Sequence, residues 1–229
     1  QIADDRDHAG MRWPSRDYVD YGYGKGTGRP VYLVTGKPQG LREHKNRSTG
    51  VSSSAAKFAS AFTLGAEIFK DIDSDFAKLI QAKALPAYQF GEAVPGNNQT
   101  ACVVSPYFYE EDNWVDDMEL AAASKYSVTK DVTWLKKADY WGQLEEVTPW
   151  MELGRARHYQ FYPFVNLGHF YLSQSNDKQI SDKYTGFMKK GLESLANRAK
   201  ENDDPFLYGV PFIWCSNNLV AAAITHARL

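Results

Sequence analysis

Apolar residues recur along most of the chain at the spacing of three and four positions that defines one face of a helix. From residue 52 onward this spacing predicts seven helices, at about residues 52–69, 75–90, 114–126, 132–144, 163–172, 182–200 and 216–229. The first fifty residues show no sustained period, so we expect a long ordered loop there, with a short strand at 31–34. The pattern therefore predicts an all-α fold.

The seven expected helices differ in how widely their apolar residues are spread. The first, third, fifth and seventh carry small or apolar residues on nearly every face, which indicates burial on all sides. The second, fourth and sixth carry one apolar stripe and present charged residues elsewhere. An inner ring of helices wrapped by an outer ring gives this alternation, so an α/α barrel is predicted. An α-solenoid is the competing interpretation, but its repeats usually share a residue signature at a fixed period, which these helices lack.

Individual residues are expected to fix the faces and ends of these helices. On the first helix, Phe58, Phe62 and Phe69 share the face that is expected to be buried. Pro86 should kink or end the second helix, because proline lacks an N–H and clashes with the preceding turn. Pro163 suits a first helical turn and is expected to begin the fifth helix.

The composition indicates a globular protein of ordinary charge. At 229 residues the chain is expected to form part of a single barrel domain covering residues 1–229. A net charge of -2 and a pI near 6.2 argue against nucleic-acid binding, and no apolar run reaches the roughly 20 residues of a membrane span. Cys102 and Cys215 are too few for a disulfide framework, and whether they pair stays open. Glycosylation sequons begin at Asn46 and Asn98 and matter only in a eukaryotic secretory pathway.

Aromatic residues, which make up 14% of the chain, gather in the loops before three of the expected inner helices. These loops are residues 105–114, 148–162 and 208–217, and each mixes aromatic with charged or amide side chains. Because the inner helices of an alternating barrel all run the same way, the loops are expected to converge on one rim. Aromatic faces stack on sugar rings, and carboxylates and amides bind hydroxyls. The sequence therefore predicts a carbohydrate-binding groove, with a purely structural aromatic belt as the alternative.

Several segments, taken in order, resemble glycoside hydrolase family 9, a family of secreted (α/α)6-barrel cellulases and related β-glucanases. Residues 7–14, DHAGMRWP, are similar to the family's Asp-His-x-x-Trp segment, and residues 53–69 are similar to the helix that follows it. EEDNWVDDMELAAA, at 110–123, resembles the family's Trp/Tyr-x-Asp-Glu-Leu helix start. WCSN, at 214–217, resembles its Trp-Gly-Ser-Asn segment. The resemblance spans nearly the whole chain.

This resemblance implies an enzyme that hydrolyses β-1,4-linked glucan, such as cellulose or a related plant β-glucan, with inversion at the anomeric carbon. A base-activated water would attack that carbon while an acid protonates the leaving oxygen. The expected partner is a polysaccharide, and the expected location is secreted, periplasmic or at the cell surface. The residues expected to contact the sugar are aromatic, imidazole and amide side chains: His8, Trp13, Trp150, His158, Tyr159, Trp214 and Asn217.

The chain departs from the family pattern where the catalytic residues are concerned. The family's base belongs to an Asp-Ala-Gly-Asp motif and its acid is a glutamate near the C-terminus, and neither that motif nor the family's His-His-Arg region occurs in the sequence. The family barrel has twelve helices, whereas seven are expected here. We therefore expect an incomplete barrel, an interior piece of a longer enzyme whose catalytic carboxylates lie outside this chain. A non-catalytic carbohydrate-binding α/α protein is the alternative.

Acidic residues open the third expected helix. Family members often hold a structural calcium near this position, which implies Asp112, Asp116 and Asp117 as its ligands here. Acidic side chains at a helix start also stabilise the helix by interacting with the positive end of its dipole, without any metal, and this interpretation stays open. No cofactor is expected to be needed for the chemistry itself.

Four further polar residues have less defined roles. Glu110 and Glu111 are the best remaining carboxylates near the expected groove, although helix capping and solvation explain them equally well. His169 and His226 lie inside apolar helices, and we expect them to be packed, hydrogen-bonded core residues.

Overall fold

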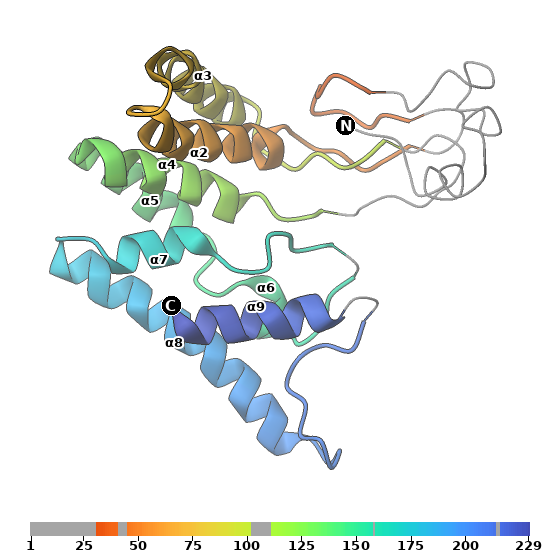
Figure 1. The fold of residues 1–229 in the computed structure, drawn as a ribbon. Coiled ribbons are helices and arrows are strands. Elements are labelled where there is room, and N and C mark those ends of the chain that lie inside the picture. Colours follow the sequence, from red (N-terminus) through yellow and green to blue (C-terminus); the bar gives the residue numbers. More distant parts are fainter. Residues whose placement is uncertain (1–30, 41–44, 102–110, 158, 214–215) are drawn as a thin grey trace.

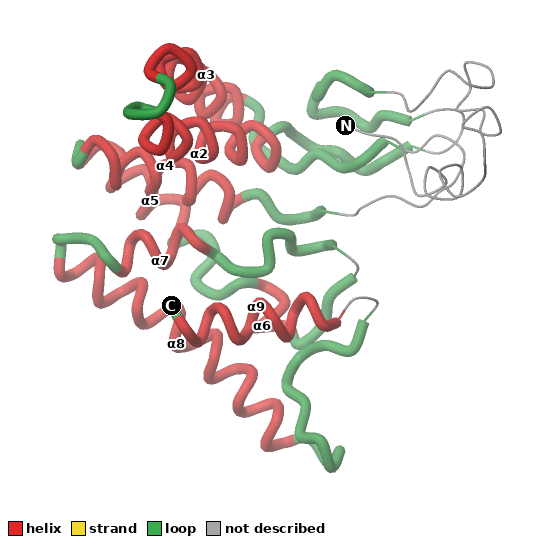
Figure 2. The backbone as a smooth tube through the Cα atoms, viewed as in Figure 1, coloured by secondary structure: helices red, strands yellow, loops and turns green. Residues whose placement is uncertain are grey.

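The computed structural model describes residues 31–40, 45–101, 111–157, 159–213 and 216–229 (Figure 1). The helices are α2 (Ser52–Phe69), α3 (Ser74–Ala93), α4 (Val115–Thr129), α5 (Val132–Gly142), α6 (Pro149–Leu153), α7 (Leu167–Ser173), α8 (Lys178–Glu201) and α9 (Ser216–Arg228). Figure 2 shows these helices connected by loops. Residues 31–40 contain no strand, so the short strand expected there was wrong. The predicted all-α fold is confirmed.

The helices form an inner row and an outer row. The inner row runs from α2 to α4 to α7, since α4 packs against both of the others. The outer helices α3, α5 and α8 each pack against the inner helix that precedes them in the chain. Each inner–outer pair is therefore a helical hairpin, as the alternating apolar pattern predicted.

The inner helices α2, α4, α7 and α9 run in one direction. In Figure 1 their N-terminal ends lie on the side of the molecule that carries the long loops, while the outer helices return toward that side. The described parts of the loops that lead into the inner helices therefore lie at one end. This end of the molecule is the predicted rim.

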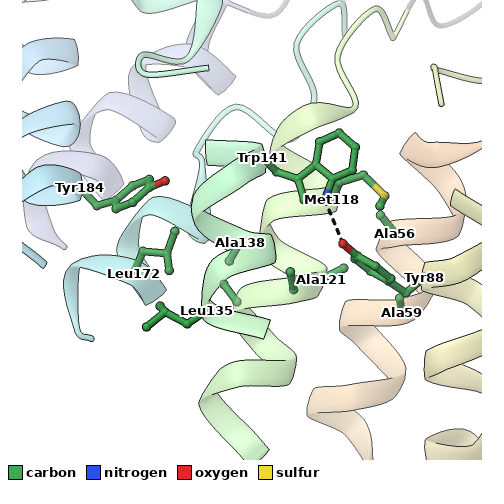
Figure 3. Close-up of a cluster of buried hydrophobic side chains, with 12 residues drawn as sticks. Ala56, Ala59, Tyr88, Met118, Ala121, Leu135, Ala138, Trp141, Leu172 and Tyr184 are labelled. Atoms are coloured by element: carbon green, nitrogen blue, oxygen red, sulfur yellow. Dashed lines mark hydrogen bonds between the residues drawn. The ribbon is translucent and has the colours of Figure 1, made fainter. Parts of the chain in front are cut away.

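The larger core fills the space between the two rows (Figure 3). Its centre is α4, where Met118 and the neighbouring alanines are almost fully buried. Ala56 and Ala59 of α2 belong to the same core, and their small size lets the two inner helices approach closely. Trp141 Nε1 of α5 donates a hydrogen bond to Tyr88 Oη of α3 at 2.9 Å, so both buried polar groups are satisfied.

The buried face of α2 differs from the expected one. Phe58 is 58% exposed, and Phe62 and Phe69 are only partly buried, while the covered face consists mainly of small residues: Ser52, Ser53, Ala55, Ala56, Ala59, Ser60, Thr63 and Ala66. Small residues on this covered face allow close contact with α3 and α4, which bulky phenylalanines would prevent. The apolar period located the helix correctly but assigned the wrong side to the core.

The helices also differ from those expected around Pro86, around Pro163 and in the loop at 148–162. α3 continues through Pro86, which therefore does not end it. α7 begins at Leu167 rather than Pro163, and the side chain of Asn166 caps its first turn. α6 lies in a stretch expected to be a loop, and it ends at Gly154, whose φ of +64° suits a glycine.

A smaller core joins α6, α8 and α9. Trp150 of α6 is fully buried and packs with Leu195 and Leu219 of the two longer helices. α9 was expected to be buried on all sides, yet Val220 and Ile224 are 42% and 66% exposed. The described residues cover α9 on one side only, and that part of the expectation was wrong.

A polar network is buried between α4 and α7. Glu119 is fully buried, and its carboxylate accepts hydrogen bonds from His169 Nδ1 at 2.7 Å and Asn166 Nδ2 at 2.9 Å. His169 Nε2 lies 3.1 Å from the carbonyl oxygen of Glu146, so both ring nitrogens face acceptors and satisfy them only when protonated. Burial lowers the pKa of His169, but the Glu119 carboxylate, together with the Glu146 carbonyl and Asp116, outweighs burial and leaves the pKa raised. His169 and His226, which bonds to a carbonyl of α8, are packed core histidines as expected.

Some expectations fall outside the described residues. Cys102 and Cys215 do so, and their pairing therefore stays a prediction. The assignment of the whole chain to one domain, with a long loop over its first fifty residues, also stays a prediction. None of the helices in the described ranges is long and apolar enough to cross a membrane.

Candidate functional site

The floor of the candidate site is the polar segment 96–101, which lies against the start of α2. Asn98 Oδ1 accepts hydrogen bonds from the Ser53 hydroxyl and the Ser54 backbone N–H, a donor that the first helical turn leaves unpaired. Asn98 Nδ2 donates to Ser54 Oγ at 2.7 Å. Gly50 packs so closely on the backbone of Pro95 and Gly96 that a side chain would have no space. The floor is thus fixed by its own hydrogen bonds and packing.

A second set of hydrogen bonds ties this floor to the residues before α4. Gln99 is buried, and its Nε2 donates to the carbonyl oxygen of Glu111 and to Asp112 Oδ1, both at 3.1 Å. Asp112 Oδ2 in turn accepts from Arg157 Nη2 at 2.5 Å and Gln160 Nε2 at 3.2 Å. Three loops that are distant in sequence therefore meet at Asp112.

One wall of the site is an ion-paired cluster. Lys57 Nζ of α2 pairs with the Glu111 carboxylate and with Asp117 Oδ2 of α4, the latter at 2.7 Å. Burial lowers the pKa of Lys57, but the two carboxylates outweigh burial and raise it. Burial raises the pKa of Glu111 by more than the Lys57 ammonium lowers it. Glu111 keeps 17% of its side chain exposed and remains accessible from the rim.

A second wall of the site is aromatic. Tyr159 and Tyr162 lie with ring centroids 5.7 Å apart, and each also contacts Phe164. Tyr159 adopts a φ of +58°, which is uncommon for a residue with a side chain. Lys57 Nζ lies 5.6 Å from the centroid of the Tyr162 ring, so the lysine contacts both walls.

These walls and the floor enclose a pocket of about 240 Å³. Its lining consists of hydroxyl, amide, carboxylate and phenol side chains: Ser54, Asn98, Gln99, Thr100, Glu111, Tyr159 and Tyr162. A pocket of this size holds a small ring-sized molecule rather than a drug-sized one. The combination of aromatic rings with fixed hydrogen-bonding groups suits a hydroxyl-rich ligand.

Both sequon asparagines contribute to the scaffold around this pocket. Asn46 and Asn98 are 2% and 7% exposed. Asn46 Nδ2 donates to the carbonyl oxygen of Gln99 at 3.0 Å, and Asn98 is held by the serines at the start of α2. Their amide groups are therefore engaged inside the folded protein.

The seven side chains expected to contact sugar differ in where the structure places them. Those outside the described residues are His8, Trp13, His158 and Trp214. Tyr159 lines the pocket, whereas Asn217 is exposed at the start of α9 and is not part of the lining. Trp150 is 0% exposed and donates from Nε1 to the carbonyl oxygen of Phe164 at 2.9 Å. Its indole offers no free face to a ligand, so its expected stacking role requires correction.

The acidic residues considered as calcium ligands are arranged in two different ways. Both oxygens of Asp112 and Oδ2 of Asp117 accept hydrogen bonds from neighbouring amide and cationic side chains. Asp116 is buried, and neither of its oxygens has a hydrogen-bond partner. Burial raises the pKa of Asp116 to about 7. In the part of the chain that is described, no three acidic, histidine or cysteine side chains are grouped as metal ligands, so calcium binding stays a prediction.

Sequence reasoning missed Lys57, Ser54, Gln99 and Tyr162. Lys57 sits in a helix where apolar spacing dominates, and it bonds to carboxylates 54 and 60 positions away. A lysine among alanines on an otherwise apolar inner helix is a signal that would have identified it. Tyr162 is the last residue of the loop 148–162, which was recognised for its aromatics, but Tyr162 itself was not singled out as a site residue.

The inner and outer rows of helices, with a polar and aromatic pocket at the rim, place the protein in the α/α-barrel class. The sequence profile of glycosyl hydrolase family 9 matches residues 1–229, and the chain belongs to this family. No curated protein matches the sequence significantly.

Solved structures show the same fold at low sequence identity. One is a thermostable endoglucanase from Alicyclobacillus acidocaldarius, at a TM-score of 0.54 and 19% identity, covering 76% of this chain and 34% of that one. AaCel9A in complex with cellobiose-like isofagomine gives a TM-score of 0.55 and 19% identity, covering 80% and 36%. The cellulase Cel9M of C. cellulolyticum gives 0.51 and 19%, covering 99% and 51%. The chain thus spans a third to a half of the length of these structures.

Proposed function

We propose that this chain is part of a glycoside hydrolase that cleaves β-1,4-linked glucan with inversion of configuration. The observation that carries the proposal is the family match over residues 1–229. A rim where hydrogen-bonding groups face aromatic rings supports it, because sugars combine flat apolar faces with hydroxyls. The alternating rows of helices support the α/α fold. A solenoid of equivalent repeats is not favoured, because the helices share no residue signature at a fixed period.

The proposed mechanism divides the work between this chain and the rest of the protein. Inversion needs two carboxyl groups roughly 6.5–9.5 Å apart, with a water between one of them and the anomeric carbon. We assign neither group to residues 1–229, which lack the family's Asp-Ala-Gly-Asp motif. In this proposal the chain supplies the sugar-binding platform: the rim loops hold the glucan and exclude water from its faces.

A hydrolysis assay separates this proposal from a non-catalytic sugar-binding protein. The natural protein that contains residues 1–229 is incubated with carboxymethylcellulose, barley β-glucan and xyloglucan, and released reducing ends are measured. Release from at least one β-1,4-glucan is the expected result. Retention on cellulose without any release would support the non-catalytic alternative, and neither retention nor release would overturn both.

We propose that calcium binds at the start of α4 with Asp116 as a ligand and without Asp112. The support is that Asp116 is a buried carboxylate with two unpartnered oxygens, whereas Asp112 has four hydrogen-bond donors around it. Calcium prefers oxygen ligands and would neutralise this charge. Thermal unfolding in 1 mM calcium and in EGTA tests this: calcium should raise Tm, and less so in Asp116→Asn. Equal Tm values in calcium and in EGTA would contradict calcium binding at this site.

We also propose that the protein acts outside the cytoplasm, as a secreted protein, in the periplasm or at the cell surface. The reason is the size of the proposed substrate, since polymeric glucan does not cross membranes. Fractionation of the source cells with an antibody against residues 1–229 would test this. Recovery in the cytoplasm alone would contradict the proposed location.

A further inference from the structure

We infer that Lys57 is a positioning residue for the proposed reaction: its ammonium holds the loops before α4 and α7 in the arrangement that binds glucan. The inference rests on the proposed function and adds to it how the rim keeps its shape. Lys57 belongs to α2 and to none of the three loops expected to contact sugar, and it is assigned no contact with the glucan.

Lys57 contacts the entrances of three consecutive inner helices. From the second turn of α2 its Nζ pairs with the carboxylate of Glu111, in the loop before α4, and with Asp117 Oδ2, in the first turn of α4, at 2.7 Å. The same Nζ lies 5.6 Å from the centroid of the Tyr162 ring, in the loop before α7. A cation at this distance from an aromatic face is attracted to it. One side chain therefore connects α2 to the entrances of α4 and α7.

The two carboxylates held by Lys57 differ in how freely they can move. The Asp117 side chain is 1% exposed and belongs to a helix, whereas Glu111 is 17% exposed and belongs to a loop. Without the ammonium, the two negative charges would face each other in a partly buried place, where water screens their repulsion only weakly. Glu111 is the residue that can turn toward solvent. Loss of Lys57 should therefore shift the loop before α4 and leave the helix in place.

The loop before α7 depends on the same ammonium. Tyr162 is 44% exposed, and the rings of Tyr159 and Phe164 that contact it belong to its own loop. The Asp112 side chain joins this loop to the loop before α4 through two hydrogen bonds. One attachment leaves two segments free to pivot about each other, and a second one fixes their relative orientation. Lys57 supplies a second attachment and anchors it on α2.

The expected defect on losing this attachment is in binding rather than in chemistry. Residues 1–229 are proposed to hold the glucan, and no catalytic carboxyl group is assigned to them. Displaced loops weaken the binding of substrate and transition state to the same extent, which raises KM and leaves kcat unchanged. A shift of about 1 Å costs up to about 100-fold in a well-fitted site, and we expect about tenfold because one attachment remains.

Two substitutions of Lys57 in the natural protein test the assignment, with the β-1,4-glucan that the unmodified protein cleaves fastest as substrate. Lys57→Met keeps most of the side-chain length without the charge, and it should raise KM about tenfold while kcat changes less than about twofold. Lys57→Arg keeps a cation that can pair with both carboxylates, so KM should stay within about twofold. If Lys57→Met does not fold, Lys57→Gln replaces it with the same expectation, because its amide still donates to one carboxylate.

The matched control is Lys183→Met, because Lys183 has similar surroundings outside the pocket lining. Its Nζ pairs with Asp139 at 2.6 Å, lies 5.6 Å from the centroid of the Tyr184 ring, and links the outer helices α5 and α8. The side chain is 27% exposed, against 32% for Lys57. Loss of this ion pair should lower Tm but leave KM and kcat unchanged.

Hydrogen exchange of backbone amides adds a measurement that needs no activity. In Lys57→Met, the amides of residues 111–114 and 159–164 should exchange at least about fivefold faster than in the unmodified protein, while those of α8 stay unchanged. Lys57→Arg should restore slow exchange in both loops. Lys183→Met should leave both loops unchanged.

The outcomes separate the positioning role from the proposed function. Faster loop exchange with a higher KM, both restored in Lys57→Arg and absent in Lys183→Met, supports the positioning role. Unchanged exchange and KM on removal of the charge, the same rise in KM in Lys183→Met, or a fall in kcat with unchanged KM overturns that role and leaves the proposed function intact. If the unmodified protein hydrolyses no β-1,4-glucan, the proposed function fails, and the role assigned to Lys57 fails with it.

Discussion

The substitution Glu119→Gln should destabilise the fold strongly, because Glu119 is the centre of a fully buried network. Its carboxylate accepts from both His169 and Asn166, and it is 0% exposed. A glutamine of the same shape has one acceptor oxygen and one NH2 group, so it cannot accept from both neighbours. Either His169 or Asn166 then keeps an unpaired buried donor. Breaking a buried ion pair on one side costs about 3–5 kcal/mol.

The assay is thermal unfolding followed by circular dichroism, supported by urea titration. For a chain of this size, a loss of about 3 kcal/mol corresponds to a fall in Tm of about 6–12 °C. The matched control is Glu146→Gln, which removes an exposed ion pair with Lys190 and should leave Tm unchanged within error. If Glu119→Gln lowers Tm no more than Glu146→Gln does, the buried network is not a stabilising ion pair and the reasoning fails.

The same pair predicts a pH dependence of stability. The folded pKa of His169 is raised, so its contribution is complete below the unfolded value of about 6.5 and is lost as pH rises through the folded pKa. The difference in Tm between the unmodified protein and Glu119→Gln should therefore shrink as pH rises above about 6.5. A difference that stays constant or grows toward alkaline pH would show that His169 is neutral in the folded protein.

Two further substitutions test the packing of the core. Gly142→Ala should destabilise the protein by about 1–3 kcal/mol, because the added Cβ would lie 2.5 Å from Tyr184 Oη. The control Gly186→Ala on α8 places its Cβ in open space and should be neutral or slightly stabilising. Urea unfolding compares the two variants, and equal midpoints would refute the tight contact at Gly142. Tyr88→Phe removes the acceptor for Trp141 Nε1 and should cost about 1–3 kcal/mol in the same assay, and a neutral result would mean that water replaces the lost hydroxyl.

The helix order and the location of the rim followed from sequence periodicity because both depend on local spacing. The fold needed only that apolar residues repeat every three or four positions and that two classes of helix alternate. The buried face of α2 could not be predicted in this way. Periodicity treats small and large apolar residues alike, whereas the close packing of the inner helices depends on small residues such as Ala56 and Ala59. The five residues of α6 are too few for any period to be seen.

The candidate site was predicted only in part, for reasons of distance and burial. Aromatic enrichment identified the loop of Tyr159, but it could not tell an exposed ring from a buried one, and Trp150 turned out to be part of the core. Lys57 and Gln99 entered the site through contacts made by folding across more than ten residues. Such contacts leave no spacing signal in a single sequence.

The most direct test of the proposed function is the configuration of the first product released from cellohexaose. Proton NMR spectra of the natural protein with this substrate, recorded before mutarotation, distinguish the two anomers at the new reducing end. The account predicts that the α-anomer appears first, as single displacement on a β-linked glucan requires. Initial release of the β-anomer, or no cleavage of any β-1,4-glucan, would contradict it.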